Sequence, residues 1–161
     1  CDRREIDSEW PLPAAVLPIR QDYHVREVRE AVKAAAREVG MSPDRAADMG
    51  LCASEAATNA LLHGHGGSAV VESRNGFLRI RVSDEGRGIS PADLPRATLL
   101  KGGSSRASMG LGFTVINETA DRVFLYTGPD GTVVIIEMSV EPMGAFALQV
   151  NPALWDDEIL V

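Results

Sequence analysis

Two amphipathic helices are predicted by the spacing of apolar residues in the first third of the chain. These residues recur at steps of three and four, as one face of a helix requires, and Gly40 fits the C-terminal end. They are Val25, Val28, Val32, Ala35 and Val39. Ser42 and Pro43 then supply an N-cap and a first-turn proline for a second helix, which we expect to end near His63.

Farther along the chain, apolar and polar side chains alternate, which predicts strands. Residues 68–74 and 77–83 are predicted to form a hairpin closed by an Asn-Gly turn, with one face of its second strand buried. A second hairpin is predicted from residues 122–127 and 132–140 around the turn GPDG. An apolar run at residues 14–20 contains a proline, which favours an edge strand.

The segment between the two hairpins is rich in glycine, serine and cations. Residues 84–95 are a predicted loop, and residues 96–110 have no clear period, which is typical of a mobile segment. Residues 111–121 then form a short predicted helix. The order of these elements predicts an α+β fold, a two-layer sandwich with helices on one face of a mixed, mostly antiparallel sheet.

We expect one domain, over residues 14–140, because a chain of 161 residues can bury one sizeable core. Residues 1–13 are a polar, proline-containing lead-in. Residues 141–161 are a less regular C-terminal extension, to which the pattern assigns no strand and no role. The chain begins with Cys1 rather than methionine, so we expect it to be processed or cut from a longer regulator.

Composition narrows the classes of function. The net charge is -7, from 23 acidic and 16 basic side chains, which argues against a nucleic-acid or anionic-membrane binder. No apolar run approaches the roughly 20 residues that a membrane helix needs. Cys1 and Cys52 make neither a disulfide framework nor a zinc site, so we expect a cytoplasmic protein with Cys52 buried as a small apolar residue.

The second helix carries an unusual column of polar residues. Glu55, Asn59 and His63 follow one another at intervals of one turn and therefore share a face. Such a face can simply meet solvent. It can also form a site, in which the amide oxygen of Asn59 binds Mg²⁺ and Glu55 acts as a general base. We expect His63 only to help end the helix.

Three glycine-containing motifs follow the helix. Asp84, which precedes the glycines of SDEGRGI, could form a simple turn or accept a hydrogen bond from an exocyclic amine. Gly110 and Gly112 open a helix, where free amides favour phosphate. Thr132 begins the final strand, at what could be an ordinary turn-to-strand junction. Each feature is common alone, but the four in this order and spacing are not.

With these motifs the sequence resembles the GHKL, or Bergerat-fold, ATPases. Within that family it is similar to the serine/threonine kinases of bacterial partner-switching systems, which include anti-sigma factors. SEAATNALLHG resembles the N box, DEGRGI the first glycine box, SMGLGFTVINETADRV the second glycine box, and GTVVIIEM the closing strand. The resemblance covers about residues 16–139.

The resemblance implies a role for each site residue. Glu55 would be the general base, Asn59 would hold the Mg²⁺ that bridges the phosphates of ATP or ADP, and Asp84 would accept a hydrogen bond from the adenine amino group. Residues 89–109 would form a lid over the nucleotide. The other residues expected at the nucleotide are Gly86 and Gly88 around the adenine, Lys101, Arg106, Gly110, Leu111 and Gly112 near the phosphates, and Thr132 behind the adenine.

The function implied by the resemblance is phosphorylation of a serine or threonine on a small antagonist protein of the STAS type. A sigma factor or a phosphatase would be a further partner, and a homodimer is compatible with the family. One alternative is the catalytic domain of a sensor histidine kinase, although no dimerisation helix pair precedes the domain and His24 lies in no convincing phosphoacceptor box. A non-catalytic, nucleotide-dependent anti-sigma module is another, and Glu55 argues against it.

Overall fold

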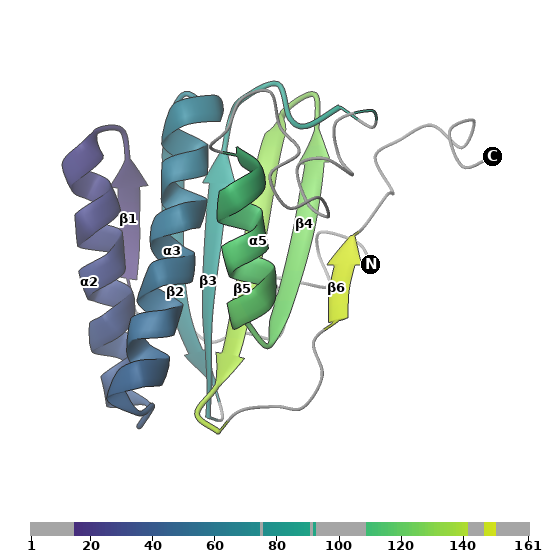
Figure 1. Ribbon diagram of the computed structural model, residues 1–161. Coiled ribbons are helices and arrows are strands. Elements are labelled where there is room, and N and C mark those ends of the chain that lie inside the picture. The colour runs from purple at the N-terminus through teal and green to yellow at the C-terminus, as the bar shows by residue number, and fades with distance from the viewer. Residues whose placement is uncertain (1–14, 75, 91, 93–108, 142–146, 151–161) are drawn as a thin grey trace.

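The computed structural model describes residues 15–74, 76–90, 92, 109–141 and 147–150. Within them, three helices cover one face of a six-stranded sheet (Figure 1). The helices are α2 (Asp22–Glu38), α3 (Pro43–His63) and α5 (Met109–Thr119). The strands are β1 (Ala15–Ile19), β2 (Gly67–Arg74), β3 (Phe77–Asp84), β4 (Arg122–Gly128), β5 (Gly131–Ser139) and β6 (Ala147–Val150). This two-layer arrangement confirms the predicted fold class.

The strands follow the order β1-β2-β3-β5-β4-β6 across the sheet. All neighbours among the first five are antiparallel, and both predicted hairpins form. β1 pairs only with β2, so the proline-containing run lies at the edge, as expected. At the other edge β6 runs parallel to β4, which corrects the expectation of no strand in residues 141–161.

The ends of the helices follow their sequence signals. The Oγ of Ser42 accepts a hydrogen bond from the backbone N–H of Arg45 at 3.3 Å, which caps α3. Gly40 follows α2 with a positive φ of 91°, a conformation that favours glycine after a helix. At the start of α2, the Nδ1 of buried His24 accepts the N–H of Gln21 at 3.1 Å. This histidine therefore closes the first turn.

The core lies between the helices and the sheet. It is built from the apolar face of α2, the many alanines of α3 and the inward side chains of β2, β3, β4 and β5. Small residues on α3 let the helix lie close to its neighbours while the strands supply the bulk. Cys52 is fully buried in this core, as the sequence predicts, and burial followed by the nearby Asp48 raises the pKa of its thiol to about 12.

A buried ion pair ties the start of α3 to the far end of the sheet. The guanidinium of Arg45 bonds the carboxylate of Asp121, and both side chains are almost fully covered. The N–H and the hydroxyl of Ser139 also donate to this carboxylate, each at 2.8 Å. Burial opposes ionisation of Asp121, but these bonds outweigh it and hold its pKa below the usual range. The cluster fixes where α3 begins relative to β5.

Replacing Arg45 by methionine is expected to lower the free energy of unfolding by about 3 kcal/mol, because it leaves the Asp121 carboxylate buried without its cation. Urea denaturation at neutral pH measures the change. Arg29→Met is the matched control, because the pair of Arg29 with Glu30 is about half exposed and contributes less than about 1 kcal/mol. Equal losses in the two variants would contradict a stabilising role for the buried pair.

The thiol of Cys52 is expected to be unreactive in the folded protein, because a buried thiol with a pKa of about 12 stays protonated at pH 8. In a Cys1→Ser background, a maleimide should label Cys52 only after unfolding. The raised pKa also predicts how stability depends on pH. The buried, protonated thiol contributes fully to the free energy of unfolding below the ordinary pKa of 9.0, and this contribution is lost as the pH rises toward about 12. Rapid labelling of the native protein would contradict this burial.

Candidate functional site

Asp84, the last residue of β3, organises the end of the sheet where the glycine motifs meet. Its Oδ1 accepts the N–H of Gly86 at 2.9 Å and the N–H of Thr132 at 3.1 Å. One carboxylate oxygen therefore joins the end of β3, the following loop and the start of β5. Within the described residues Oδ2 has no hydrogen bond and remains available as an acceptor.

The backbone around Asp84 is packed too closely for side chains. A Cβ on Gly88, whose φ is +68°, would lie 2.1 Å from the carbonyl oxygen of Gly128. A Cβ on Gly86 would lie 2.8 Å from the Cα of Gly64, and one on Gly64 would overlap the Asp84 side chain. Gly86 and Gly88 are therefore needed for the close packing of this loop, since any other residue would force the segments apart, while their role around the adenine stays a prediction. Gly64, which follows the last residue of α3, belongs to the same contact.

A small cavity lies between the helices and the sheet at this point. Its volume is about 40 Å³, and its lining includes Asn59, His63, Asp84, Thr132 and Phe113. Sites that enclose whole ligands have volumes of roughly 300–1,000 Å³, so this cavity matches one edge of a ligand. Residues from α3, β3, β5 and α5 therefore meet around one small, partly polar space, although they are far apart in the sequence.

The polar column of α3 is turned toward the first turns of α5. A Cβ built on Gly112 would lie 2.8 Å from the Oε2 of Glu55 and 3.3 Å from the Nδ2 of Asn59. Both side chains are half-buried, so the column does not form an ordinary solvent-exposed face. Gly112 provides the space into which the carboxylate and the amide reach. From the sequence, the Glu55 and Asn59 pair and Gly112 could be recognised only as two separate motifs, and the structure shows that they are in contact.

The Asn59 side chain has a buried polar atom that lacks a hydrogen-bond partner among the described residues. This atom is Nδ2. Because the nitrogen and oxygen of an amide are assigned from their surroundings, the atom without a partner can equally be the oxygen. A buried amide without a partner is costly. A bound cation or ligand group would remove that cost.

The residues present fit a metal that arrives with a ligand. No group of three or more His, Cys, Asp or Glu side chains that could hold a metal occurs among the described residues. Asn59 could supply one neutral oxygen, and Mg²⁺ typically combines one or two protein ligands with phosphates and water. A magnesium–phosphate complex therefore suits this site better than a metal held by protein ligands alone.

The surroundings of Asp84 control its charge. Burial raises the pKa of its carboxyl group above the ordinary value, whereas the N–H groups of Gly86 and Thr132 and the nearby His63 and His65 lower it. Burial dominates, so the side chain takes up a proton at a higher pH than a free aspartate. Perturbed carboxyl groups of this kind gather at functional sites.

The remaining predicted residues lie in α5 or outside the described residues. Gly110 and Leu111 fall in the first turn of α5, where backbone N–H groups have no partner within the helix and can bind an anion. Lys101 and Arg106, the expected phosphate cations, lie outside the described residues, as does most of the predicted lid.

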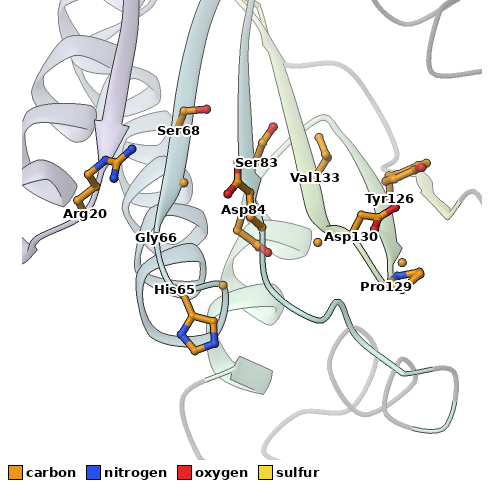
Figure 2. A pocket seen from close by; sticks show the side chains of 15 residues that line it. Arg20, His65, Gly66, Ser68, Ser83, Asp84, Tyr126, Pro129, Asp130 and Val133 are labelled. Carbon is orange, nitrogen blue, oxygen red and sulfur yellow. The ribbon is translucent and has the colours of Figure 1, made fainter.

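A second, larger cavity lies on the face of the sheet opposite to the helices (Figure 2). Its volume is about 650 Å³, and Figure 2 shows Ser68, Ser83 and Val133 side by side on neighbouring strands, with Arg20 at one end. Each of these strand residues adjoins a core residue, so its side chain points away from the helices. Glu55 and Asn59 do not line this cavity, so we place the candidate site on the helix side.

Comparison with known proteins gives the family. A model described as histidine kinase-like ATPase domain matches residues 17–138, which is most of the chain. The chain belongs to this family. Membership implies that the domain binds a nucleotide, and it confirms the resemblance to GHKL ATPases. Within the described residues, none of the helices has the length and apolar character needed to cross a membrane.

Two curated relatives are anti-sigma F factors. The one from Clostridium acetobutylicum is 33% identical over 102 residues, which cover 59% of this chain and 70% of that protein. The one from Geobacillus thermodenitrificans is 28% identical over 121 residues, which cover 70% of this chain and 82% of that protein. The catalytic domain of histidine kinase ThkA has the same fold, with a TM-score of 0.51, 14% identity, and coverage of 80% of this chain and 99% of that one.

Replacing Gly112 by alanine is expected to lower the affinity for Mg·ADP about tenfold without loss of stability. The new methyl group would push the tips of Glu55 and Asn59 aside, while alanine favours a helix by up to about 1 kcal/mol over glycine. Calorimetric titration and thermal melting measure the two effects.

Gly50→Ala is the matched control for this substitution. Gly50 is also a glycine within a helix, and its added Cβ would lie 2.8 Å from the flexible side chain of Lys33, on the side of α3 that faces α2. We expect this variant to bind Mg·ADP as the wild type does. Equal affinities in the two variants would contradict the proposed importance of the space at Gly112.

Proposed function

We propose that the protein is a Mg·ATP-dependent serine/threonine kinase of a partner-switching system. The observation that carries the proposal is the arrangement of Glu55 and Asn59, half-buried beside the first turns of α5, in a chain of the histidine kinase-like ATPase family. A carboxylate adjacent to a candidate metal ligand suits phosphoryl transfer, which depends on positioning and charge neutralisation.

Each residue has a distinct task in this proposal. The free Oδ2 of Asp84 accepts a hydrogen bond from the adenine amino group. The amide of Asn59 would hold the metal, and magnesium, when bound, would neutralise charge on the phosphates. The N–H groups at the start of α5 hold phosphate oxygens. These contacts fix the γ-phosphate relative to Glu55.

Glu55 acts on the nucleophile. Its carboxylate accepts the proton of a serine or threonine hydroxyl as the oxygen of that hydroxyl forms a bond to the γ-phosphorus. The bond from the γ-phosphorus to the oxygen that bridges to ADP breaks in the same step, and ADP leaves. The position of Glu55 beside Gly112 supports this role, because it would place the base on α3 next to the turns of α5 that would hold the phosphates.

The substrate that we propose is a small antagonist protein of the STAS type, phosphorylated on serine or threonine. Two relatives bear the name anti-sigma F factor, which supports a sigma factor as a second partner. A phosphatase that removes the phosphate would complete such a switch. A homodimer is compatible with this proposal.

The rival assignment to a histidine kinase has less support. The ThkA domain shares the fold at 14% identity, which carries no information on the residue that is phosphorylated. In this chain His24 is buried, and its Nδ1 accepts N–H groups from Gln21 and Arg20 at 3.1 and 3.3 Å. That histidine supports the helix and is poorly placed to accept a phosphoryl group.

Replacing Glu55 by glutamine is expected to lower phosphoryl transfer at least a hundredfold and to leave the affinity for Mg·ADP within about threefold, because the amide keeps the size but not the basicity. The purified wild type or variant is added with radiolabelled Mg·ATP to a lysate of the native host, and the proteins that become labelled are identified. Glu27→Gln, on the exposed side of α2, is the control and should behave as the wild type.

The label also distinguishes the rival functions. An acid-stable phosphoserine or phosphothreonine on a small protein, formed by the wild type and by Glu27→Gln but not by Glu55→Gln, is the expected result. An acid-labile phosphohistidine would instead identify a histidine kinase. Mg·ADP binding without any labelled product would mean that the domain is a nucleotide-dependent binding module.

A further inference from the structure

A chain of hydrogen bonds joins three segments behind the small cavity. The hydroxyl oxygen of Thr127, in β4, accepts the backbone N–H of Ile89 at 2.7 Å. The same oxygen lies 3.2 Å from the hydroxyl oxygen of Thr132, in β5. Thr127 is 3% exposed and Thr132 is 9% exposed, so water does not compete for these bonds. None of the roles described so far uses Thr127.

The direction of the bond between the two threonines follows from their partners. Thr127 accepts from Ile89, and the only acceptor for its own proton among the described residues is the hydroxyl oxygen of Thr132. The reverse direction would leave the Thr127 proton buried without an acceptor, which is unfavourable. Thr127 therefore donates to Thr132.

This direction decides what Thr132 presents to the cavity. With its oxygen accepting from Thr127, the Thr132 hydroxyl keeps its proton for another partner, and Thr132 lines the cavity together with Asp84. The N–H of Thr132 is already used by Asp84 Oδ1. The cavity thus offers a hydroxyl donor from Thr132 beside the free Asp84 acceptor oxygen.

We propose that Thr127 is a positioning residue that makes the site selective for adenine over guanine, an inference that rests on the nucleotide binding in the proposed function. An adenine edge carries an amino donor next to a ring-nitrogen acceptor, which matches the Asp84 acceptor and the Thr132 donor. A guanine edge carries a carbonyl acceptor next to a ring N–H donor, which opposes both. Thr127 also holds Ile89, and with it the end of the glycine loop.

Replacing Thr127 by valine tests this role, because valine keeps the shape and removes the hydroxyl. ADP and GDP are titrated into the wild type and the variant in the presence of Mg²⁺. We expect the Kd for ADP to rise about tenfold and the Kd for GDP by less than threefold, because the Thr132 hydroxyl is then free to turn and accept. Thr127→Ser restores the hydroxyl and should return both values to within about twofold of the wild type.

A purely structural role would give a different result. If the valine variant binds ADP and GDP more weakly by the same factor, or if the serine variant fails to restore discrimination, Thr127 only supports the loop and the inference is overturned. Unchanged binding in the valine variant would overturn it as well. Thermal melting of both variants confirms that the folded protein is being titrated.

The outcomes separate this inference from the proposed kinase activity. Absence of ADP binding to the wild type would overturn both. If Glu55→Gln leaves phosphorylation intact, the proposed catalytic mechanism fails, yet the selectivity set by Thr127 is still measured by ADP and GDP. If Thr127→Val leaves the ratio of the Kd values for ADP and GDP unchanged, the inference fails, whereas the kinase proposal stands.

Discussion

The arrangement of the candidate site depends on one carboxylate oxygen. Oδ1 of Asp84 receives two backbone N–H groups, one from the loop that follows β3 and one from the start of β5. A half-buried carboxylate needs such partners, and the second of them, Thr132, lies 48 residues from Asp84 in the chain. Because one oxygen is committed to the backbone, the other is held at a fixed place and remains open to a ligand.

Much of the fold could be predicted from the sequence, because its signals are local. The steps of three and four in α2, the Ser-Pro start of α3 and the two alternating hairpins all depend on neighbours in the chain. β6 could not be predicted, since its four residues are too few for a periodic pattern and its partner β4 is distant. The pairing of Arg45 with Asp121 spans 76 residues and leaves no sequence pattern.

The site was predicted in part for a similar reason. Glu55 and Asn59 could be linked by helical spacing, and the structure places them with Gly112, while their chemical roles remain predictions. Thr127 was not predicted as a site residue, because a threonine in a strand fits the ordinary preference for β-branched residues. Only the pairing of β4 with β5 sets its hydroxyl beside that of Thr132.

The two cavities have a consequence for communication across the sheet. Asp84 and Gly64 border the large cavity, and Asp84 also borders the small one, so at this end of the protein a single layer of backbone separates them. A molecule bound in the large cavity would contact the end of β3, where we propose that the adenine binds on the other side. The shared Asp84 would therefore couple the occupancy of the two cavities directly, without any contact through the distant core.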